Sequence, residues 1–305
     1  MSDVVVVDEA SAEVVREAQE LIDAAAGEDG QAAVSEQGRI ALRGGRRAGV
    51  RHLLLRREGE LVGYGQLEDT DPVEAPAGEL VVHPDHRGKG YGRQLGEALL
   101  DTSHRRLRVW AHGGHPAARH LAQVLGLSLF RELRQLRRPL AGAAAEGVPP
   151  LPDPALPAGV RIRTFRPGED DADWLRLNAA AFAHHPEQGS LTQRDLDDRK
   201  AEAWFDPAGF FLAEREDGTL AGFHWTKVHS AEQLGEVYVL GVAPDAQGSG
   251  LGKALTAVGL HHLARDRGLP TAMLYVDADN GAAVRVYEGI GFRTHETDLM
   301  YRTEG

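Results

Sequence analysis

The segment VAPDAQGSGLGKAL, residues 242–255, decides the fold of this chain. It places Pro-Asp after an apolar run, follows it with three glycines at alternate positions, and continues into an amphipathic helix. A close copy, VHPDHRGKGYGRQL, occupies residues 82–95, 160 positions earlier. In each copy a strand runs into a helix start, where the first backbone N–H groups lack partners inside the helix and the helix dipole favours negative charge. Both copies therefore predict a phosphate site.

The composition is that of a soluble globular protein. The 305 residues suffice for two domains, and 42% hydrophobic and 26% charged residues exclude a disordered chain. No apolar run could span a membrane, and the N-terminus MSDVVVVDEA is acidic where a secretory signal is basic, so we expect a cytoplasmic protein. The net charge of −12 argues against nucleic acid or membrane partners, and the absence of cysteine excludes disulfides and thiolate sites.

The two halves repeat one order of elements. In the second half we expect strands at 161–165, 209–216, 220–229, 236–242, 272–278 and up to about residue 301, with helices at 170–183, 192–204, from the glycine turn to 267, and at 280–292. In the first half we expect strands at 4–7, 51–57, 60–67, 78–82, 107–110 and 131–140, with helices at 11–26, after the glycine turn, and at 116–127. The pattern indicates an internal duplication of the α+β (mixed α/β) class.

A proline-rich stretch separates the halves. Residues 139–160 contain six of the 15 prolines and few residues that could form a core, which is typical of a stiff linker. We expect a domain at 1–140, a linker at 141–159 and a second domain at 160–305.

The glycine spacing discriminates among nucleotide-binding motifs. A Rossmann turn needs G-x-G-x-x-G, whereas the glycines here are 248, 250 and 252 (88, 90 and 92 in the first copy). A P-loop needs glycine at position 247 and Ser or Thr after the lysine, whereas the sequence has Gln247 and Ala254. Both patterns fail on spacing.

The residues QGSGLG, 247–252, and RGKGYG, 87–92, resemble the Q/R-x-x-G-x-G/A pyrophosphate loop of the GCN5-related N-acetyltransferases (GNAT). The resemblance covers nearly the whole chain apart from the linker. It implies two tandem GNAT domains, each a mixed, mostly antiparallel sheet flanked by helices, that use acetyl-CoA without a metal. In the second half the resemblance assigns cofactor contacts to Leu240, Gly241, Val242, Gln247, Gly248, Ser249, Gly250, Leu251, Gly252, Lys253, Asn280, Gly281, Ala282, Ala283, Val284 and Arg285. In the first half it assigns them to Leu80, Val81, Val82, Gly88, Lys89, Gly90, Tyr91, Gly92 and Arg93.

Acetyl transfer to an amine needs a base for the amine, a backbone N–H for the developing oxyanion and a proton donor for the thiolate. Glu236 begins the strand that enters the second turn and is expected to take the amine proton through water. Tyr287, seven positions beyond Asn280, is placed like the tyrosine that protonates the coenzyme A sulfur in the family. Each alone is more simply a solvated strand end or a packed helix residue, and the glycine loop between them favours the catalytic interpretation.

The first half lacks both groups. A constant offset places Pro76 at the position of Glu236, and the helix at 116–127 places Ala122 at that of Tyr287 and His115 at that of Asn280. The backbone and glycines that would hold coenzyme A are present, so we expect the first copy to bind or support and the second to catalyse.

By resemblance, acceptor contacts fall on Glu36, Glu187, Lys227, Glu236 and Tyr275. Carboxylates suit an ammonium group and sugar hydroxyls, and lysine donates to hydroxyls. We expect a small-molecule acceptor, a monomeric protein, and Glu36 reaching the second active site from the first half. Two alternatives stay open: a GNAT enzyme for another amine, such as an aminoglycoside, a polyamine or a protein N-terminus, and a sensor that binds acyl-CoA without transferring it. The histidine pairs show no zinc spacing, so we expect no metal.

Overall fold

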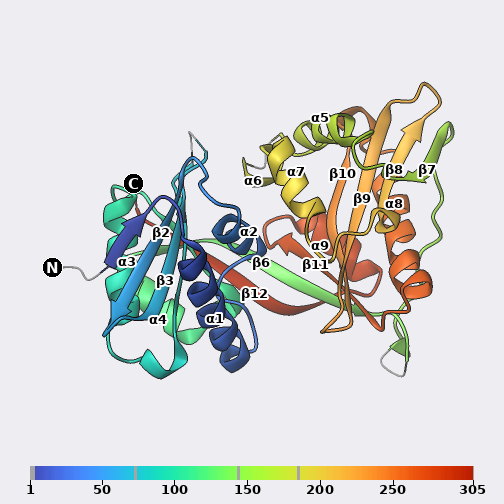
Figure 1. Cartoon of the computed structure of the whole chain (residues 1–305). Coiled ribbons are helices and arrows are strands. Elements are labelled where there is room, and N and C mark those ends of the chain that lie inside the picture. The colour runs from blue at the N-terminus through green and yellow to red at the C-terminus, as the bar shows by residue number, and fades with distance from the viewer. Residues whose placement is uncertain (1–3, 72–73, 143–144, 184–185, 305) are drawn as a thin grey trace. The chain divides into compact units, whose positions relative to one another are not determined.

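The computed structural model describes residues 4–71, 74–142, 145–183 and 186–304 (Figure 1). The chain forms two compact units. The first comprises residues 1–133 and 297–305, and the second comprises residues 134–296. No helix in the described ranges has the length and apolar character that crossing a membrane would require.

The first unit is a sheet with helices on both faces (Figure 1). Its strands lie in the order β1-β2-β3-β4-β5-β12, with one parallel pair, β4 and β5, among antiparallel neighbours. Helices α1 and α2 cover one face, and α3 and α4 the other. The bounds are β1 Val4–Val7, α1 Ala12–Asp29, α2 Glu36–Arg43, β2 Val50–Arg57, β3 Glu60–Glu68, β4 Ala77–Val82, α3 Tyr91–Thr102, β5 Arg108–Ala111, α4 Pro116–Val124 and β6 Ser128–Pro139.

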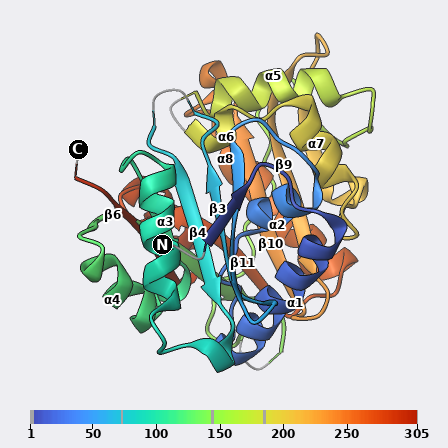
Figure 2. The same ribbon diagram turned by 60° about the vertical axis from the view of Figure 1, so that its left-hand side comes forward.

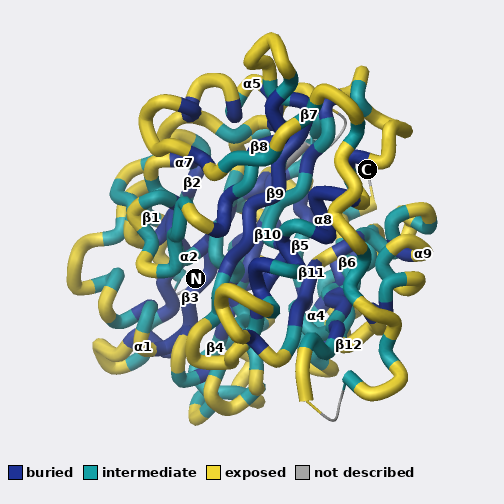
Figure 3. Tube along the Cα trace, turned by 90° about the vertical axis from the view of Figure 1, so that its right-hand side faces the viewer, coloured by how far each residue is buried: buried dark blue, intermediate teal, exposed yellow. Residues whose placement is uncertain are grey.

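The second unit repeats this plan. Its strands lie in the order β7-β8-β9-β10-β11-β6, again with one parallel pair, β10 and β11. Strand β9, in the middle of this sheet, is buried without interruption from Ala221 to Lys227 (Figure 3). The bounds are β7 Val160–Thr164, α5 Asp171–Ala181, α6 Pro186–Gly189, α7 Gln193–Lys200, β8 Phe210–Arg215, β9 Leu220–His229, β10 Leu234–Val242, α8 Leu251–His261, β11 Thr271–Asp277, α9 Gly281–Gly289 and β12 Arg293–Arg302.

Two core layers position the site in the second unit. Trp174 and Trp225 lie in an aromatic layer between the sheet and helices α5 and α7, which we call the α5/α7 face. Leu260 and Leu274 lie in an aliphatic layer on the opposite, α8/α9 face. Because successive strand residues point to opposite faces, each strand contributes to both layers.

The unit boundaries fall inside two strands, which differs from the contiguous domains expected at 1–140 and 160–305. Strand β6 begins in the first unit and ends in the second, and β12 does the reverse. The end of β12 pairs with β5, Leu299 opposite Ala111 and Arg302 opposite Arg108. The last strand in the chain therefore completes the first sheet, which sequence order alone does not reveal.

Two other expectations need correction. Helix α2 was not expected, because it has only 8 residues, about two turns, and a glycine inside it. Ser35 caps it by accepting a hydrogen bond from the N–H of Gly38. The proline-rich segment, which we expected to be a stiff linker, falls within the second unit and is hydrogen-bonded to it. Pro149 accepts a hydrogen bond from the Arg138 guanidinium, and the Pro152 carbonyl lies 3.1 Å from Nε2 of His261.

Candidate functional site

The parallel strands of the second unit separate toward their carboxyl ends and open a gap. Strand β10 pairs with β11 from Leu234 to Val237 only, while its pairing with β9 continues to Val242. The register with β9 shifts between Val237 and Val239, so Tyr238 is the extra residue of a β-bulge. A bulge bends its strand and increases the twist. The bulge lies directly after Val237, where the pairing of β10 with β11 ends.

Backbone N–H groups point into this gap. The N–H of Ala243 donates to the carbonyl of Ala221 on β9. Since N–H directions alternate along a strand, those of Leu240 and Val242 point the other way, toward β11. They are donors without a strand partner on that side, as an oxyanion site requires.

The glycine turn follows directly and begins helix α8. Gly248 and Gly250 have φ angles of 76° and 86°, a left-handed conformation that glycine adopts without strain. A Cβ atom at either position would meet nothing within 4 Å, so the backbone angle and open access, not crowding, explain these glycines. Gly250 caps α8 without a side-chain hydrogen bond, and the N–H of Leu251 donates to Oγ of Ser249 at 3.4 Å. The N–H groups of Gly252 and Lys253 in the same turn are placed to bind an external anion. This cradle fits a pyrophosphate.

Helix α9 lies on the α8/α9 face beside the gap. Asn280 caps it by accepting from the N–H of Ala283, which fixes where the helix begins. Tyr287 lies two turns further, packs in one cluster with Leu240 and places its ring edge-on against Phe292. Burial raises the pKa of Tyr287, so its hydroxyl keeps its proton at neutral pH and can donate it.

Glu236 lies on the opposite face of the same strand. Val237 packs in the cluster that contains Tyr287, so its neighbour Glu236 points to the α5/α7 face. Glu236 is 7% exposed, and Lys227 of β9 stands directly opposite it in the register. Nε2 of His229, two residues further along β9, lies 2.7 Å from Oε2 of Glu236. The base and the acid proposed from sequence therefore lie on the two faces of one sheet, on either side of the gap.

Two aromatic rings lie beside the Lys227 ammonium. Its Nζ lies 4.6 Å from the ring centroid of Trp204 and 5.3 Å from that of Tyr238. The Tyr238 hydroxyl accepts from Nε of Arg199, a buried arginine of α7. This arrangement holds a cation close to Glu236 through ring faces.

Sequence reasoning missed His229, Tyr238, Trp204 and Arg199. His229 alone carried a readable signal: it follows Lys227 by two residues and so shares its face, and the hairpin brings both beside Glu236. The other three depend on the bulge and on how α7 packs.

The remaining predicted acceptor residues are placed as follows. Tyr275 lies on β11, is 42% exposed, and its hydroxyl accepts from Nε2 of Gln135. Glu187 falls in α6, and its side chain lies outside the described residues. Glu36 begins α2 of the first unit.

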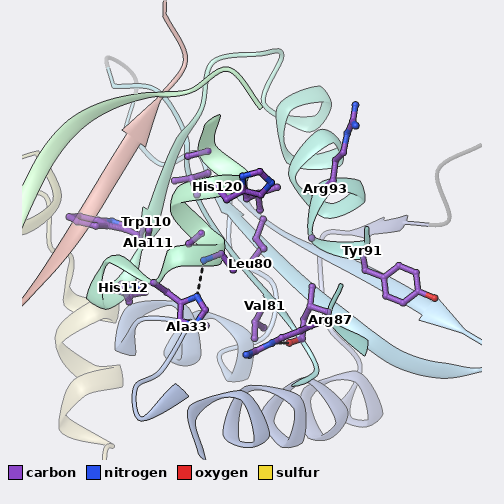
Figure 4. A pocket seen from close by; sticks show the side chains of 18 of the residues that line it. Ala33, Leu80, Val81, Arg87, Tyr91, Arg93, Trp110, Ala111, His112 and His120 are labelled. Carbon is purple, nitrogen blue, oxygen red and sulfur yellow. Dashed lines mark hydrogen bonds between the residues drawn. The ribbon is translucent and has the colours of Figure 1, made fainter. Parts of the chain in front are cut away.

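The first unit contains a cavity of about 550 Å³ in the corresponding place (Figure 4). Strand β4 pairs with β5 at Ala77 and Gly78 only, so these strands also separate. All the predicted first-half cofactor residues line the cavity except Lys89, whose Nζ donates to the Asp85 carbonyl. Gly90 begins α3 with a φ of 82°, matching Gly250. Both units therefore have a pair of parallel strands that separate and a left-handed glycine that begins the following helix.

The matched register confirms that the first unit lacks the two proposed catalytic groups. Ala77 stands opposite Glu68 as Glu236 stands opposite Lys227, so the equivalent of Glu236 is Ala77. The constant offset had indicated Pro76 and was wrong by one residue, because β10 contains the bulge and β4 does not. Ala122 is the seventh residue of α4 as Tyr287 is of α9.

His115 matches Asn280 in structure as well as in sequence. Its Nδ1 accepts from the N–H of Ala117 and caps α4. The capping role is thus retained in a helix that has lost the tyrosine.

A buried charged cluster lies beside the first-unit cavity, on the face of the sheet that α1 and α2 cover. Nε2 of His112 lies 3.0 Å from Glu79 and its Nδ1 lies 3.2 Å from Asp298 of β12. Glu79 also accepts from the N–H and hydroxyl of Ser35, at the start of α2. Burial alone would lower the pKa of His112, but the hydrogen bonds to Asp298 and Glu79 and their negative charges outweigh it and raise the pKa to about 10. His112 is therefore a doubly paired imidazolium in the lining of the first-unit cavity.

Arg87, the first residue of the first loop motif, is also engaged. Its guanidinium forms a bidentate ion pair with Asp29 at 2.7 and 2.8 Å. The hydrogen bond from Arg87 lowers the pKa of Asp29, so the pair is charged at neutral pH. No group of three or more potential metal-ligating side chains gathers anywhere in the described parts of the chain.

Known proteins show the same organisation. The model of the acetyltransferase (GNAT) family matches residues 17–127 and 174–292, once in each half. The mycothiol acetyltransferase of Streptomyces avermitilis is 74% identical over 284 residues, which cover 93% of this chain and 90% of that protein. That of Thermobispora bispora is 54% identical over 287 residues, which cover 92% and 93%.

Solved structures agree on the fold. A tandem GNAT protein from the clavulanic acid biosynthesis pathway superposes with a TM-score of 0.69 at 19% identity, covering 99% of both chains. A GCN5-related N-acetyltransferase from Sphaerobacter thermophilus gives 0.65 at 22% identity, covering 99% of this chain and 96% of that one.

Proposed function

Since the chain belongs to the acetyltransferase (GNAT) family, and within it to the mycothiol acetyltransferases, we propose that its second unit acetylates the cysteinyl amine of cysteinyl-glucosaminyl-inositol with acetyl-CoA. This step completes mycothiol. The observation that carries the proposal is the pairing of a phosphate cradle with Glu236 and Tyr287 on the two faces of one gap.

Acetyl-CoA would be held by the turn 247–252 and the first turns of α8 and α9, and it supplies an activated acyl group. The N–H groups of Leu240 and Val242 stabilise negative charge that develops on its carbonyl oxygen. Glu236 accepts the proton of the attacking amine through water, and Tyr287 donates a proton to the leaving sulfur. Holding the amine and the acyl carbon together on opposite sides of the gap supplies the entropic part of the rate gain.

The α5/α7 face suits the proposed acceptor. Glu236 attracts an ammonium group, and the Lys227 ammonium can donate to sugar hydroxyls. The aromatic ring of Trp204 beside Lys227 offers an apolar surface to a sugar ring. Glu187, Tyr275 and Glu36 remain proposed acceptor contacts.

For the first unit we propose that it holds coenzyme A or acetyl-CoA without transferring the acetyl group. Its cavity and glycine turn are complete, but its catalytic positions hold Ala77 and Ala122. The cluster of Glu79, His112 and Asp298 lies beside that cavity.

The test is acetyl transfer from acetyl-CoA to purified cysteinyl-glucosaminyl-inositol, beside a panel of an aminoglycoside, a polyamine and peptide N-termini, with free coenzyme A measured by chromatographic separation. Selective acetylation of the cysteinyl amine supports the proposal. Transfer only to another amine refutes the acceptor and retains the reaction. Stoichiometric binding of acetyl-CoA with no turnover would favour a sensor.

A further inference from the structure

The hydrogen bond between His229 and Glu236 has no counterpart in the first unit and no assigned role. His229 ends β9, and its side chain is 25% exposed, whereas that of Glu236 is 9% exposed. Among the residues whose positions are described, no other side chain hydrogen-bonds the Glu236 carboxylate. One oxygen of the proposed base is thus tied to an imidazole at the edge of the site, and the other is available to the acceptor.

A glutamate that acts as a base must have its carboxylate held in one orientation. Its side chain has three rotatable bonds, and the last of them is broadly populated, so a carboxylate at the end of a strand samples several orientations. A displacement of about 1 Å at a reacting group costs on the order of 10²-fold in rate. A hydrogen bond of 2.7 Å to a charged acceptor is short and strong enough to select one orientation.

The imidazole can hold the carboxylate in either of its charge states. Both the neutral tautomer protonated at Nε2 and the imidazolium donate from Nε2. The contact with Oε2 therefore does not require His229 to gain or lose a proton during turnover. A residue that only orients the base can therefore be distinguished from one that itself takes up the proton.

We propose that His229 is a positioning residue for the acetyl transfer: its Nε2–H fixes Oε2 of Glu236 and thereby directs Oε1 toward the acceptor amine. The inference rests on the proposed function, because it assumes that Glu236 is the base. Lys227, the charged group opposite Glu236 in the register, lies on the same face with its Nζ over the rings of Trp204 and Tyr238.

The experiment compares His229→Gln with His229→Asn in the full-length protein. The Gln amide nitrogen stands three bonds from Cβ, as Nε2 of histidine does, whereas the Asn amide nitrogen stands two bonds away and cannot reach Oε2. Both variants replace the titratable ring with an amide group. We expect His229→Asn to lower kcat about 10- to 100-fold with an unchanged KM for acetyl-CoA, and His229→Gln to stay within about threefold of the wild type.

A double-mutant cycle completes the test. In a Glu236→Gln background, His229→Asn should cause no further loss, because a residue that acts only through Glu236 has nothing left to position. Equal losses in the two His229 variants would show that the ring itself exchanges protons, which overturns the inference. So would an additive loss in the Glu236→Gln background, or wild-type rates in His229→Asn. The wild type is assayed first. If it acetylates none of the amines in the panel, the proposed function is refuted. If the wild type is active but the variants do not show the expected pattern, only the inference about His229 is refuted.

Discussion

Raising the pH from 7 to 9 should destabilise the first unit through His112. The imidazolium is held by Glu79 and Asp298, and its pKa is about 10 in the folded protein against 6.5 for the free side chain. The folded state therefore binds one proton more than the unfolded state between these two values. Stability from this proton is fully present below about pH 6.5 and is lost as the pH rises toward 10.

The magnitude follows from the proton difference. One proton changes the free energy of unfolding by about 1.4 kcal/mol per pH unit, and above pH 7 the unfolded imidazole is mostly deprotonated. Between pH 7 and pH 9 the expected loss is about 2.5 kcal/mol. In a unit of this size the melting temperature falls by roughly 5–10 °C.

The assay is the urea midpoint at pH 7 and pH 9, followed by pulse proteolysis with fragments assigned to residues 1–133. The control is the double variant His112→Gln, Asp298→Asn. Its two amide groups can still form hydrogen bonds, but the cation and one carboxylate are removed. We expect its midpoint to change little between the two pH values. An equal pH slope in the wild type and the control would refute a protonated His112.

Three further predictions concern the second unit and its copy. Tyr287→Phe should lower kcat on the order of 10²-fold with acetyl-CoA. The loss should be smaller with an acyl donor whose thiol has a lower pKa, because such a thiolate leaves without being protonated. An equal loss of kcat with both donors would exclude the proton-donor role of Tyr287. Gly250→Val forces a side chain into a left-handed conformation and should raise KM for acetyl-CoA, whereas Gly90→Val should lower the coenzyme A binding stoichiometry measured by calorimetry and leave turnover intact. If Gly90→Val abolishes turnover in a folded protein, the division of labour is wrong. Lys227→Met should raise KM for the acceptor several-fold and leave KM for acetyl-CoA unchanged in initial-rate kinetics.

Much of the fold was predictable because its signals are local. The hairpin turn at Gly59 has φ angles of 52° and 92° at Glu58 and Gly59, as a tight turn requires, and β9 occupies the expected residues 220–229. The glycine turn encodes its own backbone angles, so the cradle could be located to the residue. The match of Asn280 to His115 was confirmed because a helix cap is also a local feature.

The rest could not be predicted because it depends on contacts between distant segments. Pairing of β12 with β5 joins residues almost 200 positions apart, and no short-range pattern marks it. The cluster around His112 needs Glu79 from β4 and Asp298 from β12 at once.

The bulge at Tyr238 lets β10 carry one residue more than β4 and still present Glu236 at the position that Ala77 holds in the first copy. With one residue more than β4, strand β10 keeps its glycine turn in the matched place and shifts everything before Tyr238 by one position relative to that turn. Because side-chain direction alternates, an ungapped strand with this sequence would turn Glu236 to the α8/α9 face, away from Lys227 and His229. Because the extra residue is accommodated as a bulge, Glu236 stays on the α5/α7 face, and the Tyr238 ring lies against Lys227. Deleting Tyr238 removes the bulge and leaves Glu236 opposite Lys227, as Ala77 stands opposite Glu68 in β4. Turnover should therefore survive with a raised KM for the acceptor, because the ring beside Lys227 is lost, and a variant that binds acetyl-CoA without any turnover would refute this account.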